Sequence, residues 1–164
     1  MNNRTAVKKL VVAGMIAAAY TVLTLAPVVK ELSFYAVQLR LAEILNLAAF
    51  IDPIYGTGVV LGCFISNLAS PFGMMDALLG TAATALAVFL IGRTKNLFAA
   101  SLWPALVNGA IIGAEINFFE NVPLGPAWFL NPLLVMAGEL AVVTAVGYPV
   151  FKFFVLNRVL ASKS

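Results

Sequence analysis

The chain has 164 residues, of which 62% are hydrophobic and 10% are charged, and its mean hydropathy is +1.00. Because soluble domains carry roughly 25% charged residues, this composition excludes a soluble globular protein and indicates an integral membrane protein. The formal net charge of +3 comes without a basic run interleaved with aromatic residues, so nucleic acid is not an expected partner.

The residue content also excludes several kinds of chemistry. Histidine is absent, which removes His-ligated metal, haem and Ser-His catalysis. The one cysteine, Cys63, lies in an apolar run and can form no internal disulfide. The sequence has no Gly-x-x-x-x-Gly-Lys-Ser/Thr phosphate loop, so the chain does not hydrolyse ATP by that route. We therefore expect no enzymatic activity, no cofactor and no metal. Energy for any uptake would come from a partner or an ion gradient.

The length leaves room for roughly five to seven spanning helices of about 20 residues and for no separate soluble domain. The sequence predicts an all-α integral membrane protein in which residues 1–164 form one domain, a single bundle of six transmembrane helices. The spans are expected at residues 8–26, 38–52, 54–68, 74–91, 97–114 and from 129 to between 149 and 156. Prolines and polar turns separate them, and residues 115–128 are expected to form a loop.

The first span carries pairs of small residues four positions apart, Ala13 with Ala17 and Gly14 with Ala18. This spacing lets another helix approach closely within a membrane. We therefore take this small-residue face as a candidate docking surface for a partner, and packing inside the bundle is the alternative.

The second span contains Arg40 and Glu43 inside an otherwise apolar segment that begins near Gln38. On a helix, residues three positions apart share a face and can pair. A charge at membrane depth costs about 3 kcal/mol or more unless it is compensated, so such residues usually face a protein interior or a water-filled cavity. The segment is predicted to form the first wall of a binding pocket. The alternative is that Glu43 only neutralises Arg40.

An even number of spans puts both chain ends on one side of the membrane, and that side then holds eight basic residues against two. By the positive-inside rule, it faces the cytoplasm. The eight are Arg4, Lys8, Lys9, Arg93, Lys95, Lys152, Arg158 and Lys163, and the two are Lys30 and Arg40. We expect a multi-pass protein of the cell membrane with both termini cytoplasmic.

The acidic residues have the opposite distribution, because only Asp52 falls on the cytoplasmic side. Glu43, Asp76, Glu115 and Glu139 come from four segments and reach a similar depth, which solvated loop acids do not explain. Amides and aromatic rings accompany them: Gln38, Asn46, Asn67, Asn108, Asn117, Tyr35, Phe72, Phe118 and Trp128. An outward-facing site of this kind suits a planar ligand rich in hydrogen-bond donors better than an anion.

Simpler structural roles remain open for most of these residues. Asp76 can cap the fourth span, and Asn67 and Asn108 can form hydrogen bonds between helices. Trp128 can be an interfacial anchor instead of a pocket wall. Glu139 resists a structural interpretation best, because it lies about ten residues into the last span with no basic neighbour in sequence.

Four groups of residues together match a known pattern. They are Gln38-x-Arg40-x-Ala42-Glu43; Gly62-Cys63-Phe64-Ile65-x-Asn67-x-x-Ser70-Pro71-x-Gly73-x-x-Asp76-x-x-x-Gly80-Thr81; Asn108-Gly109; and Gly138-Glu139. This pattern resembles the QueT family, the queuosine-precursor S components of energy-coupling factor (ECF) transporters. The similarity extends over nearly the whole chain, and the middle group is the most specific part of it.

The resemblance implies a substrate-binding membrane subunit that works with a transmembrane coupling subunit and two cytoplasmic ATPases. It also implies that Ala13 and Ala17 dock the partner and that the substrate is a deazaguanine. A carboxylate can accept two parallel hydrogen bonds from the amide N–H and amino group of that ring, and an aminomethyl form adds a cation that needs a second carboxylate. The candidate substrate-binding residues are Gln38, Arg40, Glu43, Asn67, Asp76, Asn108 and Glu139.

Two other functions stay open. The chain can be an S component for another vitamin-like molecule, or a proton-coupled carrier that acts alone with Glu43 or Glu139 as the relay. The sequence also leaves open whether a queuosine precursor would carry a nitrile, an aminomethyl group or the full queuine ring.

Overall fold

The computed structural model describes residues 3–27, 33 and 39–156, and side chains as far as residue 153. Within these ranges the secondary structure is helical, as the sequence predicts. The first helix, α1 (Asn3–Leu25), begins about one turn before the predicted start and ends ahead of Pro27. Gln38 and Tyr35, which the sequence analysis placed in the site, lie outside the described residues.

The second predicted span is short and irregular. Leu39 and Arg40 are not helical, and the chain then forms a 3-10 helix, η1 (Leu41–Leu47), followed by one α-helical turn, α3 (Ala48–Ile51). Asp52 ends this segment and caps α4 (Pro53–Asn67) by accepting a hydrogen bond from the backbone N–H of Ile54 at 3.0 Å. Pro53 occupies the first turn of α4, where its missing N–H costs nothing.

The next two long helices differ from the prediction in one place. Helix α5 (Met74–Arg93) follows the predicted fourth span closely. The fifth span is divided into α6 (Leu97–Ser101) and α7 (Trp103–Phe119), and the predicted loop from residue 115 is wrong, because α7 continues to Phe119. Apolar residues alternate with Glu115 and Asn117 in this last stretch, and both polar side chains point into the protein, which is why they are compatible with helix.

The last span begins with a 3-10 turn, η2 (Pro126–Phe129), and continues through α8 (Leu130–Glu139). It is then wound as π-helix in η3 (Leu140–Gly147) and η4 (Phe151–Leu156), with α9 (Tyr148–Val150) between them. In the described part of the chain, four helices are long and apolar enough to cross a membrane: Asn3–Leu25, Met74–Arg93, Leu97–Phe119 and Pro126–Phe153. Helix α4, with 15 residues, and the segment Leu41–Ile51 are shorter.

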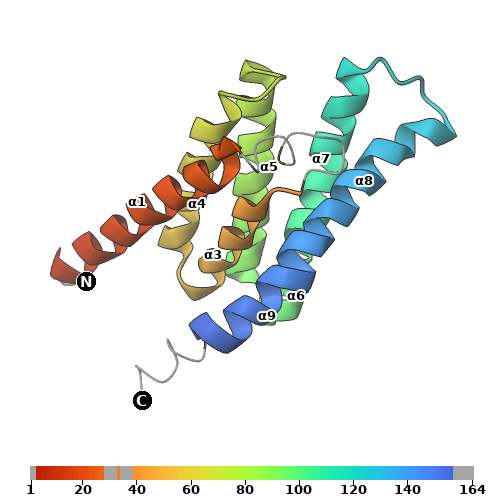
Figure 1. Ribbon diagram of the computed structural model, residues 1–164. Helices are drawn as coiled ribbons and strands as arrows, with labels where there is room; N and C mark the ends of the chain where they lie inside the picture. Colours follow the sequence, from red (N-terminus) through yellow and green to blue (C-terminus); the bar gives the residue numbers. More distant parts are fainter. Residues whose placement is uncertain (1–2, 28–32, 34–38, 157–164) are drawn as a thin grey trace.

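The helices pack as neighbours in the order α1, α4, α5, α7 and α8 (Figure 1). Segment η1 runs through the middle of this arrangement and contacts α1, α4, α5 and η3. Close approach depends on glycines: a Cβ on Gly58 would lie 2.1 Å from the backbone oxygen of Ala13, and one on Gly113 would lie 2.3 Å from Pro132 Cα. The polar residues of η1 are therefore surrounded by helices on several sides.

Candidate functional site

Arg40 and Glu43 form an ion pair inside the bundle. Arg40 Nη1 lies 3.9 Å from Glu43 Oε1, and both side chains are buried. The pairing occurs as predicted, but Arg40 has an extended backbone and precedes η1 instead of sharing a helix face with Glu43. Arg40 Nε also donates a hydrogen bond to the backbone oxygen of Ser33 at 3.4 Å. The arginine thus ties two stretches of backbone together.

Glu43 is held by two further neighbours. The Tyr20 hydroxyl from α1 donates a hydrogen bond to Oε1, and the Asn46 side-chain amide donates one to Oε2. Both carboxylate oxygens therefore have partners, which fits the alternative that Glu43 compensates Arg40 in the ligand-free protein. Sequence analysis missed Tyr20. It lies three residues after Ala17 on the buried face of α1, and that spacing could have identified it.

Asn67 and Asp76 meet where α4 ends and α5 begins. The Asn67 amide donates to the backbone oxygen of Asp76 at 3.2 Å and to Cys63 Sγ at 3.3 Å. The Asp76 carboxylate accepts no hydrogen bond from the described residues, and the N-cap position of α5 is Gly73. Asp76 therefore does not cap this helix. A Cβ on Gly80 would lie 2.5 Å from both Asn67 Nδ2 and Asp76 Oδ1, so glycine there provides the space for these side chains.

Asn108 and Glu139 connect α7 with α8. The Asn108 amide donates to Glu139 Oε1 at 2.6 Å, and both residues are buried. Asn108 thus forms the helix-helix hydrogen bond that was its structural alternative. Glu139 Oε2 accepts no hydrogen bond from the described part of the chain. The carboxylate is consequently anchored on one side and open for a donor on the other.

Glu115 is one of the four acids that the sequence places at a similar depth, but it is absent from the predicted substrate-binding residues. Its side chain is buried in α7, and neither carboxylate oxygen accepts a hydrogen bond from the residues described. It lies seven residues after Asn108, which on a helix is two turns along the same face. That spacing supports counting Glu115 with Asn108, although the sequence analysis expected the helix to end at residue 114.

Electrostatic interactions place these groups around Arg40. Arg40 interacts with Glu43 and Asp76, Glu115 interacts with Asp76 and Arg40, and Glu139 interacts with Glu43 and Arg40. Arg40 therefore forms an ion pair with Glu43 and also interacts electrostatically with Asp76, Glu115 and Glu139, which come from α5, α7 and α8. The structure thus brings together the acids that the sequence supplies from separate segments.

Most of the unused polar atoms in this cluster are acceptors. Nine buried side-chain oxygens accept no hydrogen bond from described residues, and eight of them belong to carboxyl or amide groups. They belong to Asn46, Asn67, Asp76, Thr81, Asn108, Glu115 and Glu139. Buried polar atoms are normally satisfied, so this number is an unusual feature that calls for a donor-bearing partner.

Several other residues named from the sequence lie elsewhere. Asn117 donates to the backbone oxygen of Trp128 at 2.6 Å and accepts from Asn131 at 3.0 Å, so it fixes the connection between α7 and α8. The Phe118 side chain is 72% exposed and does not face the cluster. Phe72 stacks on Phe119 with ring centroids 4.7 Å apart. These residues shape the end of the bundle and leave the polar cluster to other side chains.

Ala13 and Ala17 are buried between α1 and α4. The backbone oxygens of both alanines approach glycines of α4, Gly58 and Gly62, so closely that a Cβ there would lie within 2.1 and 2.7 Å of them. This is the packing inside the bundle that was the alternative to partner docking. Whether the two alanines also dock a partner stays a prediction.

The polar cluster contains no recognisable metal centre. Within the described ranges, no group of three or more His, Cys, Asp or Glu side chains is arranged to hold a metal ion. The arrangement can instead offer a bound molecule several carboxylate and amide acceptors at once.

Comparison with known proteins shows the family to which the chain belongs. A family model described as QueT transporter matches residues 10–155. The Queuosine precursor transporter QueT of Lactococcus lactis subsp. cremoris (strain MG1363) is 33% identical over 136 residues, which cover 73% of this chain and 78% of the relative. No solved structure matches significantly. The chain belongs to the QueT transporter family.

Proposed function

We propose that this protein is the substrate-binding S component of an ECF-type importer and that its substrate is a queuosine precursor with a deazaguanine ring. Family membership supports transport, and the curated relative is named for a queuosine precursor. The observation that carries the proposal is the set of buried oxygens that accept no hydrogen bond from the described residues. A ligand with several N–H groups would satisfy them.

The chemistry of a deazaguanine matches this set of acceptors. Its ring N–H and exocyclic amino group lie side by side, and one carboxylate can accept both hydrogen bonds. Asp76 and Glu115 each have two oxygens available for such a pair, and Glu139 has one. With four acids and one arginine in the cluster, an aminomethyl cation would also be compensated. The nitrile, aminomethyl and queuine forms all remain candidates, because each contains the same ring edge.

For the topology we propose six membrane-crossing segments with both termini in the cytoplasm of a multi-pass cell-membrane protein. The two shorter helical segments, Leu41–Ile51 and α4, would count as spans that are surrounded by the longer ones. Basic residues support the orientation. Lys9 pairs with Asp52 at 2.5 Å beside the start of α4, and Arg93 and Lys95 lie at the α5–α6 connection. Positive charge of this kind marks a cytoplasmic face.

Transport would then require partners. We propose a transmembrane coupling subunit and two ATPases, since the sequence has no phosphate loop of its own. Helix α1 remains the candidate docking element. Ala13 and Ala17 contact α4 from one face of it, whereas Gly14 and Ala18 are exposed on another. A partner can reach the second pair without separating α1 from α4.

The test is a ligand screen by thermal shift on the detergent-purified protein, comparing deazaguanines with guanine, thiamine and riboflavin. The proposal expects stabilisation by deazaguanines alone, since a ligand that binds only the native state stabilises it. Stabilisation by thiamine or riboflavin would instead support an S component for another molecule. Uptake by the isolated chain in liposomes, driven by a pH gradient, would refute dependence on ATPase partners.

A further inference from the structure

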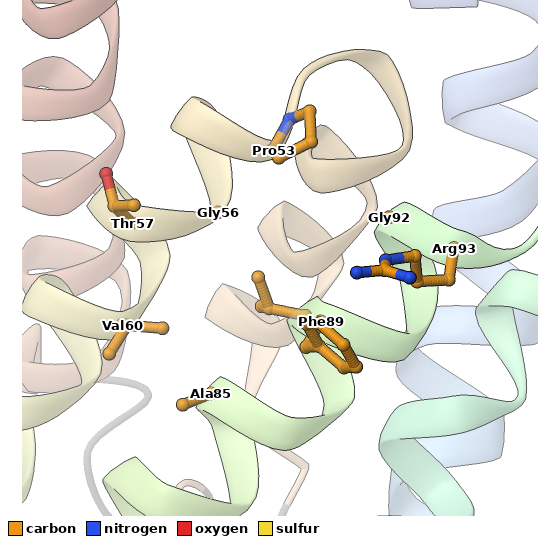
Figure 2. A pocket seen from close by; sticks show the side chains of 9 residues that line it. Pro53, Gly56, Thr57, Val60, Ala85, Phe89, Gly92 and Arg93 are labelled. Carbon is orange, nitrogen blue, oxygen red and sulfur yellow. The ribbon is translucent and has the colours of Figure 1, made fainter.

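An apolar groove runs along the outside of the bundle between α4 and α5. It encloses about 500 Å³, and Figure 2 shows how its walls are made. One wall is α4 with Pro53, Gly56 and Thr57, and the opposite wall is α5 with Phe89 and Arg93. The groove is separate from the polar cluster, since no residue of that cluster lines it.

Small residues create this groove. Gly56 is buried against α5, where a Cβ would lie 2.2 Å from Val88 Cγ1, so the helices can approach here only with glycine. Gly92 is different, because a Cβ there would lie 3.7 Å from the nearest heavy atom, an ordinary van der Waals contact. A Cβ at residue 92 therefore meets no clash, and a larger side chain at this lining position would extend toward the groove.

The groove is about as long as one leaflet of the membrane is thick, and it is apolar along its length with a basic residue at one end. From Ala85 to Arg93 it follows nine residues of α5, a rise of about 12 Å at 1.5 Å per residue, and half of the roughly 30 Å hydrocarbon core of a bilayer is about 15 Å. Its inner part is apolar, and at its end the Arg93 guanidinium lies 4.8 Å from the centroid of the Phe89 ring. In the part of the chain described, no acidic side chain forms an ion pair with Arg93, whereas the nearby acid Asp52 is paired with Lys9.

We propose that this groove binds an anionic phospholipid of the cytoplasmic leaflet, with one acyl chain along α4 and α5 and the phosphate at Arg93. The assignment to the cytoplasmic leaflet rests on the proposed topology. The binding chemistry rests on the apolar lining and on Arg93. Negative lipids are attracted to basic residues at the cytoplasmic surface, and basic pockets between helices there bind lipid headgroups. A neutral or zwitterionic lipid would fill the apolar part and gain no net charge attraction at Arg93.

The test uses native mass spectrometry of the full-length protein in detergent, titrated with phosphatidylglycerol or phosphatidylcholine, and needs no transport substrate. We expect phosphatidylglycerol to be retained more strongly. Arg93→Gln should reduce this retention about fivefold, the effect of one basic residue near an anionic surface. Gly92→Leu should abolish retention of both lipids by filling the groove.

Two matched variants serve as controls. Lys152→Gln removes a basic residue that lies outside the groove and donates to the Tyr148 hydroxyl, and Gly14→Leu adds a side chain on α1 where nothing lies within 4 Å. Both should retain phosphatidylglycerol as the unmodified protein does. Equal binding of the two lipids, or equal losses for Arg93→Gln and Lys152→Gln, would overturn the proposal. A photo-crosslinker at the exposed residue 57 that captures a protein subunit in membranes, instead of lipid, would also overturn it.

Discussion

Replacement of Glu139 by glutamine tests whether this carboxylate binds the ligand or only joins α7 to α8. Glutamine has the same shape, and its oxygen can still accept the 2.6 Å hydrogen bond from Asn108. The amide nitrogen then takes the position of Oε2, which has no partner among the described residues. A ligand N–H that binds there would meet a donor instead of an acceptor.

The expected loss follows from the value of a charged hydrogen bond. Such a bond contributes about 1.5–3 kcal/mol, and each 1.4 kcal/mol changes affinity about tenfold. We therefore expect Glu139→Gln to weaken deazaguanine binding about 10- to 100-fold in isothermal calorimetry. The unliganded protein should unfold at nearly the same temperature, because glutamine keeps the shape of the side chain and its hydrogen bond with Asn108.

Glu120→Gln is the matched control, since Glu120 is exposed and accepts a hydrogen bond from Asn131 at 2.9 Å, outside the cluster. It should leave the affinity unchanged. If Glu139→Gln also binds the ligand with unchanged affinity, Glu139 does not contact the substrate, and its role is limited to joining α7 to α8.

Three further predictions test the remaining steps. Gly80→Ala should weaken ligand binding in calorimetry, because its Cβ would displace the ends of the Asn67 and Asp76 side chains instead of backbone; unchanged binding would show that the positions of these two side chains are unimportant. Gly113→Ala should destabilise the fold by about 1–3 kcal/mol in thermal unfolding, because its Cβ would collide with Pro132 backbone atoms; a protein of normal stability would contradict the close α7–α8 contact. Ala18→Leu should abolish ATP-dependent uptake in proteoliposomes with the complete importer and spare ligand binding, and normal uptake would remove this face of α1 from partner docking.

The sequence was sufficient to predict helices where apolar runs end at proline or polar turns. Helix α5 and the start of α8 agree closely with the predicted spans. The end of α7 was wrong for a physical reason: polar residues at 115 and 117 suggested a loop, yet a buried site stabilises acids and amides within a helix. Polarity therefore marks a loop only where the side chains reach water, and sequence alone does not show whether they do.

The candidate site was predictable in composition but not in its internal pairing. A single sequence shows that Arg40 and Glu43 are close, because the spacing is local. It does not show that Tyr20, 23 residues away, completes the hydrogen bonds of Glu43, or that Asn108 takes one oxygen of Glu139 across 31 residues. These pairings depend on which helices become neighbours, and in this protein glycines on the contact faces decide that.

The acids of the site differ in how many of their carboxylate oxygens have hydrogen-bond partners within the protein. Glu43 has partners on both oxygens and lies beside Arg40, so its charge is compensated without a ligand. Asp76 and Glu115 accept nothing from the described residues, and Glu139 has one buried oxygen that accepts no hydrogen bond from them. Because a buried polar atom without a hydrogen-bond partner is costly, the empty site is the less stable state of these groups, and a donor-rich ligand offsets that cost as it binds. The same acids that make the unliganded protein less stable would therefore provide the selectivity of the proposed importer subunit.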